Sequence, residues 1–153
     1  MLPDATVVRG ALSAGGVTVA EVEGVSLGLV GRVPAAEVLT ALRAIAASGH
    51  GFTMLVDLLG TDTDEDVEIT YHLRSLSRDE ELYLKTRLPY GGVLESAWEV
   101  YPAALMPERE TAELFGLRLA GHPNPKRLLT TDGIEPLLLR SVEIRSIEEV
   151  RAR

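Results

Sequence analysis

Cysteine is absent from the 153 residues of this chain. Without thiolates the chain cannot hold a cysteine-ligated iron–sulfur cluster or a cysteine-type zinc site, and it has no disulfide framework. The sequence also contains no window that approaches the roughly 20 apolar residues needed to span a bilayer, and its start lacks a basic region followed by an apolar one. We therefore expect neither an inserted segment nor a secretory signal, and the composition is compatible with a reducing cytosol.

The motifs of common enzyme classes are missing as well. The sequence has no GxSxG nucleophile elbow, no HExxH zinc motif, no Walker loop and no GxGxxG dinucleotide motif. Gly15-Gly16 and Gly91-Gly92 lack the strand–helix context and the lysine that phosphate binding requires. His50, His72 and His122 lie on separate segments, so a three-histidine metal site would exist only if the fold assembled it.

Positive charge is in deficit. The chain has 15 Lys and Arg against 23 Asp and Glu, a formal net charge of −8. Such a charge repels phosphate backbones and anionic lipid, so we expect no nucleic-acid partner and no direct membrane insertion or adsorption. The excess acid lies before residue 126, and the remaining residues are nearly neutral. A polar protein partner fits this balance better.

The length and the apolar spacing predict one two-layer α+β domain over residues 1–141, with a C-terminal tail at 142–153. Its sheet should be mixed or largely antiparallel, with helices packed on one face. In chain order the expected elements are a hairpin of Val17–Val22 and Ser26–Val30, a helix from Pro34 to Ala46, a central strand Phe52–Gly60, a hairpin of Val67–Arg74 and Leu82–Leu88, and a short helix over Leu94–Tyr101.

A charged helix follows Pro107, a residue that suits a first helical turn because it has no amide hydrogen. Carboxylates at Glu108 and Glu110 suit the positive end of the helix dipole, and Gly116 supplies a left-handed stop. The two carboxylates point about 200° apart around a helix, so they cannot act on one substrate atom. Arg109 stands four residues before Glu113 and can pair with it.

The segment Glu108-Arg109-Glu110, with Phe115-Gly116 and Gly121-His122-Pro123, resembles a known signature. It is similar to the pattern E-R-E-x-x-D-x-F-G-I-x-F-x-G-H-P of the thirty-kilodalton or C subunit of respiratory complex I (NADH-quinone oxidoreductase). Upstream, the same family pattern is matched by Phe52, Leu55, Asp57, Asp62 and Tyr71-His72-Leu73. The resemblance spans roughly residues 50–131, in order and with its spacing preserved.

The resemblance implies a non-catalytic structural and docking subunit of the peripheral arm, on the cytoplasmic side of the bacterial cell membrane. The chain would contact the D and B subunits of complex I and carry no cofactor, while FMN, iron–sulfur clusters and quinone would belong to partner subunits that pass electrons from NADH. An isolated chain could form a homo-oligomer through the surface its partner covers. The implied interface residues are Glu108, Arg109, Glu110, Phe115, Gly121, His122, Pro123 and Arg127.

Departures from the pattern keep other interpretations open. Glu113 replaces the usual aspartate, and residues 134–141 lack the charged run with which the family closes. One alternative is a homologous subunit of a membrane-bound hydrogenase or formate-hydrogenlyase type complex. Another is a free-standing enzyme or small-ligand protein in which Asp57, His72 or His122 acts.

Overall fold

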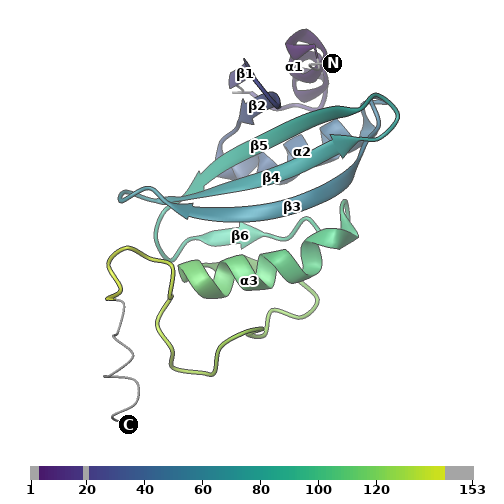
Figure 1. Ribbon diagram of the computed structural model, residues 1–153. Coiled ribbons are helices and arrows are strands. Elements are labelled where there is room, and N and C mark those ends of the chain that lie inside the picture. The colour runs from purple at the N-terminus through teal and green to yellow at the C-terminus, as the bar shows by residue number, and fades with distance from the viewer. Residues whose placement is uncertain (1–3, 19–20, 144–153) are drawn as a thin grey trace.

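The computed structural model describes residues 4–18 and 21–143, which form a five-stranded sheet, a two-stranded sheet and three α-helices (Figure 1). In chain order the elements are α1 (Ala5–Ala14), β1 (Glu21–Val25), β2 (Gly28–Arg32), η1 (Ala35–Glu37), α2 (Val38–Ala47), β3 (Phe52–Asp62), β4 (Val67–Ser75), β5 (Glu80–Leu88), β6 (Val93–Glu95), η2 (Pro102–Ala104), α3 (Leu105–Phe115) and β7 (Arg118–Ala120).

The large sheet has the strand order β1-β2-β5-β4-β3, and all neighbours are antiparallel except β2 and β5. Along β4 the buried face carries Val67, Ile69, Tyr71 and Leu73, while the residues between them face outward. This alternation places the apolar core on one face, where α2 lies behind the sheet in Figure 1. The predicted α+β class with a mixed, mostly antiparallel sheet is confirmed.

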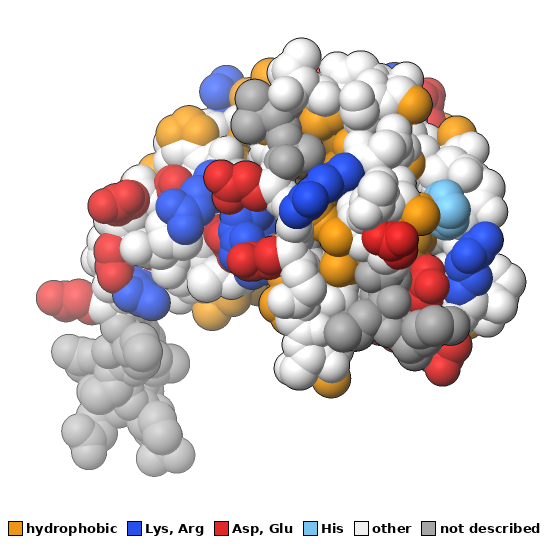
Figure 2. Space-filling view, turned by 90° about the horizontal axis from the view of Figure 1, so that it is seen from above, with side chains coloured by type: hydrophobic (Ala, Val, Ile, Leu, Met, Phe, Trp, Pro, Cys, Tyr) orange, Lys and Arg blue, Asp and Glu red, His pale blue; other side chains and the backbone are white. Residues whose placement is uncertain are grey.

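The outer face of β4 and β5 is polar and self-paired. Lys85 Nζ lies 2.6 Å from Glu68, and His72 Nε2 lies 2.5 Å from Glu81. His72 also stacks on Tyr83 with ring centroids 4.5 Å apart. Seen from above, Lys and Arg side chains lie among Asp and Glu side chains, and charges of one sign do not gather (Figure 2). Opposite charges on neighbouring strands thus neutralise one another.

Helix α3 packs at the β3 end of the sheet because Gly60 has no side chain. A Cβ added there would lie 2.5 Å from the Phe115 ring and 3.0 Å from Thr111 Cγ2. Gly60 stands opposite Ile69, so α3 covers the same buried face as α2. Thr111 and Phe115 thus lie on the face that α3 buries, and the helices lie on one face of the sheet as expected.

The prediction that Phe52–Gly60 is the central strand is wrong, because β3 is an edge strand. Its apolar outer residues Met54, Val56 and Leu59 are 42–51% exposed. The pairing of β3 with β4 is irregular at two places, between Phe52 and Met54 and between Leu55 and Asp57. Asp57 Oδ1 accepts the Leu58 amide hydrogen at 2.8 Å. The prediction failed because apolar residues on both faces of a strand do not reveal whether another strand lies beside it. Irregular pairing such as that of β3 keeps an edge strand from pairing with further strands.

Two further expectations are adjusted. The first hairpin is confirmed but begins later, at Glu21, and Val19 and Ala20 of the predicted strand lie outside the described residues. The stretch Leu94–Tyr101 is not one helix, since Leu94 pairs with Leu119 in the parallel β6–β7 sheet. That pairing joins distant segments, so local periodicity could not indicate it.

The other predicted elements form close to their expected bounds. The second hairpin is β4–β5, and the helix after Pro34 is η1 followed by α2. Helix α1 was not predicted, although Asp4 accepts the Thr6 amide hydrogen as its N-cap and Val8 and Leu12 face the core. Residues 144–153 of the predicted tail lie outside the described residues.

Candidate docking site at α3

Helix α3 begins earlier than predicted, so Pro107 lies in its first turn as the third residue rather than the first. Ala104 precedes the helix without a side-chain cap. Gly116 ends it in the left-handed conformation with φ 69°, as the sequence predicts, and a Cβ there would lie 2.7 Å from Pro136 Cγ. The same glycine thus stops α3 and lets a later segment pack against it.

Glu108 of α3 is fully buried. Its carboxylate accepts hydrogen bonds from the Ser96 hydroxyl and, at 2.7 Å, from the Ala97 amide. Burial raises the pKa of Glu108, whereas these two donors and His122 oppose that rise. Glu108 therefore ties α3 to the segment after β6, and it has no surface to offer a partner directly.

His122 is also buried, and both ring nitrogens are engaged. The Asn124 amide donates to Nδ1 at 2.9 Å, so the ring proton lies on Nε2, which donates to the Leu105 carbonyl at 2.8 Å. Glu108 Oε2 is 4.0 Å from Nε2. Phe115 is 6% exposed and packs in the core. Of the implied interface residues, Glu108, His122 and Phe115 thus shape the surface from below and do not lie on it.

Residues 121–140, which we call the strap, run from the end of β7 past α3 and return to the β3–β4 turn (Figure 1). At the start the Gly121 carbonyl accepts a hydrogen bond from Trp98 Nε1 at 3.0 Å. At the return the Leu138 amide donates to Leu114 O at 3.0 Å, and the Arg140 amide donates to Asp62 Oδ2 at 2.8 Å. The strap is thus held at both ends.

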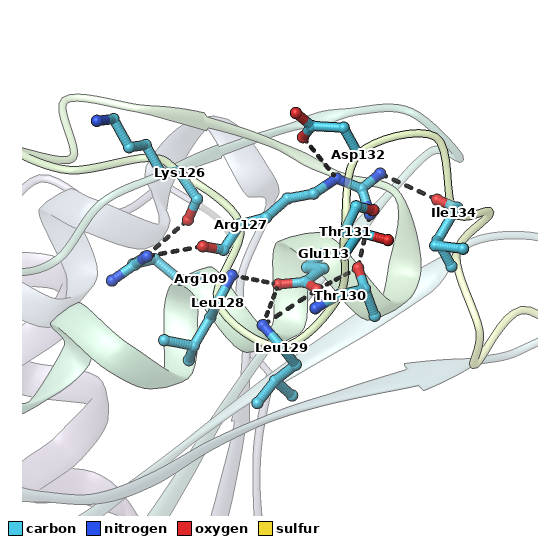
Figure 3. A network of polar contacts seen from close by, with 10 residues as sticks. All are labelled: Arg109, Glu113, Lys126, Arg127, Leu128, Leu129, Thr130, Thr131, Asp132 and Ile134. Carbon is cyan, nitrogen blue, oxygen red and sulfur yellow. Dashed lines mark hydrogen bonds and ion pairs between the residues drawn. The ribbon is translucent and has the colours of Figure 1, made fainter.

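Arg109 holds the middle of the strap to α3. Its Nε donates to the Lys126 carbonyl at 2.7 Å and its Nη2 to the Arg127 carbonyl at 2.9 Å (Figure 3). Arg127 in turn donates to Thr130 Oγ1 at 2.6 Å and to the Ile134 carbonyl at 3.0 Å. Two predicted interface arginines therefore organise the strap through neutral oxygen acceptors.

Glu113 binds the strap from the next turn of α3. Its carboxylate accepts the amide hydrogens of Leu128, Leu129 and Thr130 and the Thr130 hydroxyl (Figure 3). Desolvation opposes its ionisation, but these donors outweigh that effect and lower the pKa of Glu113 to about 2. Within the described residues Glu113 does not pair with Arg109, so the predicted i,i+4 ion pair is wrong.

The exposed members of the predicted set lie on α3 and on the strap. Glu110, Gly121, Pro123 and Arg127 are exposed and Arg109 is half-buried. The sequence did not single out the role of Glu113 or two nearby cations, Arg118 and Lys126, which line a pocket of about 390 Å³ with Arg109 and Arg127. Nothing in the local sequence around Arg118 or Lys126 indicates that these two residues lie close to Arg109 and Arg127.

The three residues of the enzyme alternative do not meet at one site. Asp57 and His72 face each other across β3 and β4 on the outer face, whereas His122 lies near α3. Residues 4–18 and 21–143 contain no group of three or more His, Asp or Glu able to hold a metal ion. In the same part of the chain, no helix has the length and apolar character required to cross a membrane.

Fold and site together define an α+β domain in which a charged helix carries a long polar strap. Residues 31–142 match the family model described as "Respiratory-chain NADH dehydrogenase, 30 Kd subunit". This range runs from β2 to the end of the strap, and the chain belongs to that family.

Individual relatives agree with the family match. The chain is 38% identical to the C subunit of the NADH-quinone oxidoreductase of Rhodobacter capsulatus over 61% of its own length and 48% of that protein's. It is 32% identical to the C subunit from Caulobacter sp. (strain K31), over 91% of this chain and 69% of the relative. The chain spans about half the length of the first relatives that it matches.

A solved structure shares the fold. It is a chain of the membrane-bound sulfane sulfur reductase, an archaeal respiratory membrane complex, with a TM-score of 0.66 and 25% sequence identity. The similarity covers 76% of this chain and 70% of that one. The resemblance that the sequence shows is thereby confirmed at the level of the family and its fold.

Proposed function

We propose that this chain is a non-catalytic structural subunit of the peripheral arm of a proton-translocating NADH-quinone oxidoreductase. The observation that carries the proposal is the family match over residues 31–142, which includes the last two residues of β2, strands β3, β4 and β5, α3 and the strap. The relatives are named as C subunits of NADH-quinone oxidoreductases. As a member of a complex I subunit family, the chain functions by assembling with other subunits.

The docking surface of this proposal is α3 with the strap. Arg109, Glu110 and Arg127 supply its polar groups, and Pro123 is exposed beside them. The buried Glu108 and His122 fix the segments on which it rests. Exposed apolar side chains lie on the same two elements. They are Met106, Leu129, Ile134, Leu137 and Leu138, each 41–61% exposed. Apolar and aromatic residues inside a polar rim are typical of a protein interface. The partners that we propose for this surface are the D and B subunits.

Electron transfer belongs to the assembly in this proposal. FMN, iron–sulfur clusters and quinone reside in partner subunits, and this chain holds the quinone-site and cluster-bearing subunits in register. Its location is the cytoplasmic side of the cell membrane, as a peripheral subunit without a spanning helix of its own in the described residues.

The test is affinity purification of the tagged full chain from gently solubilised membranes of the source organism, with partners identified by mass spectrometry and NADH oxidation assayed. We expect the B and D subunits together with NADH-quinone activity. Recovery of the chain alone from the soluble fraction would overturn the proposal.

A second candidate is an equivalent subunit in a respiratory membrane complex of another chemistry, such as a membrane-bound hydrogenase or formate-hydrogenlyase type complex. The observation in its favour is the shared fold with a chain of the archaeal sulfane sulfur reductase complex. In the same purification this candidate predicts co-purified subunits without NADH oxidation. The 32–38% identity to C subunits of NADH-quinone oxidoreductases favours the first candidate.

A further inference from the structure

A basic pocket lies between α3, β7 and the strap, in a chain that is otherwise acidic. Its volume is about 390 Å³, and it is lined by four of the fifteen Lys and Arg residues but by only one of the twenty-three Asp and Glu residues. The cations are Arg109, Arg118, Lys126 and Arg127, and the carboxylate is Glu113. This concentration of positive charge runs against the net charge of −8.

The one carboxylate does not neutralise these cations. Glu113 is turned toward the strap amides of residues 128–130, and those donors together with Thr130 Oγ1 surround both of its oxygens. In Figure 3 the Lys126 ammonium group points away from this network. The negative charge of the pocket is therefore already bound within the chain.

The cations themselves are held by neutral groups. Arg109 donates to two strap carbonyls, and Arg118 Nε donates to the Gly91 carbonyl at 3.2 Å. Within the described residues, Arg109, Arg118 and Lys126 have no carboxylate oxygen within 4.0 Å, and Arg127 reaches only Asp132, at 3.9 Å on a fully exposed side chain. Neutral acceptors orient a guanidinium group without cancelling its charge.

Several cations elsewhere in the chain are arranged differently. Arg74, Lys85 and Arg140 each lie beside a carboxylate, of Glu81, Glu68 and Asp64 respectively. Because the carboxylate offsets the positive charge, such a paired cation attracts an acidic partner only weakly. The pocket thus gathers four cations, of which Arg127 alone lies within 4.0 Å of a carboxylate of the described residues, that of the exposed Asp132.

From this arrangement we propose that the pocket receives an acidic segment of a partner subunit, with one or two Asp or Glu side chains entering it. This inference rests on the proposed function and names the chemistry of the docking partner. Planar guanidinium groups match carboxylates, and the apolar part of the lining, including Leu117, Pro125 and Pro136, suits the methylene groups of Glu. A nucleic-acid backbone is disfavoured because the net charge of −8 on the chain would repel its many phosphates, whereas one or two carboxylates need contact only the pocket cations.

The first experiment titrates the full chain with acetyl-Glu-Glu-Leu-Glu-amide and, as a matched probe, acetyl-Gln-Gln-Leu-Gln-amide, following the amide and arginine side-chain NMR signals. The expected result is saturable shifts at Arg109, Arg118, Lys126 and Arg127 with the Glu peptide alone. Equal shifts with the Gln peptide, or shifts confined to other regions, would overturn the inference.

The second experiment tests the partner in the assembled complex. The variant Arg118→Glu with Lys126→Glu reverses two pocket charges, and Arg43→Glu with Arg78→Glu makes the same change in net charge at two exposed sites elsewhere. The pocket variant should recover the B and D subunits about ten-fold less well than the wild-type chain, and the control variant should recover them normally.

The two proposals fail in different ways. If the wild-type chain recovers the B and D subunits but the pocket variant recovers them equally well, the pocket inference is wrong and the proposed function stands. If the wild-type chain recovers no respiratory subunits, the proposed function is wrong and the partner inference falls with it. Circular dichroism of both variants checks that they are folded, so that a reduced recovery of partner subunits is not caused by misfolding.

Discussion

The sheet body and the strap are stabilised by different kinds of interaction. Among the described residues of the body, twenty-seven buried apolar residues form one core that runs from Val8 in α1 to Leu117. In the strap, most residues from 121 to 140 are exposed, and a few side chains of α3 and the β3–β4 turn hold the backbone by hydrogen bonds. Apolar burial stabilises the whole fold cooperatively, whereas hydrogen bonds at a surface can open locally. The strap can therefore respond to a partner without unfolding the body.

The largest effect is expected from breaking the body. Leu84 of β5 is fully buried between the helices and the sheet, and Leu84→Ala removes apolar atoms and leaves a cavity. We expect a loss of about 2–5 kcal/mol in the free energy of unfolding, measured by urea denaturation. The control Leu27→Ala, at a side chain 73% exposed, should change it little. Similar losses for both would contradict the burial of Leu84 in the core.

The second prediction concerns Glu113, whose carboxylate binds the strap and is not part of the apolar core of the body. Glu113→Ala deprives three strap amides and the Thr130 hydroxyl of their acceptor. We expect hydrogen exchange at residues 128–130 to rise about ten-fold or more while core strands keep their protection. Glu110→Ala, at an exposed residue of the same helix, is the matched control. Unchanged exchange at 128–130 would show that Glu113 does not hold the strap.

The same contact predicts a pH dependence. The pKa of Glu113 is lowered from 4.5 to about 2, so ionised Glu113 binds the strap fully above pH 4.5 and loses this contribution as the pH falls toward 2. Exchange at residues 128–130, corrected for its intrinsic pH dependence, should therefore rise between these values. The Glu113→Ala variant should lack the transition.

These contacts show which parts of the molecule the sequence could indicate. Residues whose role depends on local spacing were predicted well, such as Gly116 at the helix stop and the alternating residues of β4 and β5. The burial of Glu108 and His122 depends on Ser96, Ala97 and Leu105, which approach only after the chain folds back. The edge position of β3 likewise depends on strand order, which the pattern within one strand does not contain.

The fourth prediction concerns Arg109. Arg109→Glu removes the donors to the Lys126 and Arg127 carbonyls and places a carboxylate beside them. We expect weaker complex assembly and faster exchange at the start of the strap, with the free energy of unfolding of the isolated chain lowered by no more than about 1 kcal/mol. Pull-down and urea denaturation measure the two effects. An unfolded isolated variant would remove Arg109 from the interface residues.

The smallest effect is expected on the polar outer side of the sheet. Arg32 Nη1 lies 2.6 Å from Glu23 across the β1–β2 hairpin, with the two side chains 42% and 57% exposed. Water screens such a pair, and holding two long side chains costs conformational entropy. Arg32→Gln should lower the free energy of unfolding by about 0–1 kcal/mol, measured by urea denaturation.

Salt and a second variant sharpen this last test. The difference between wild type and Arg32→Gln should shrink further when the ionic strength is raised, because salt screens exposed charges. The double variant Arg32→Gln with Glu23→Gln should then be no less stable than Arg32→Gln alone, since neither member of the pair then carries an uncompensated charge. A loss comparable to that of Leu84→Ala would mean that outer-face pairs stabilise the body as strongly as its core, and the distinction between apolar body and polar surface would not hold.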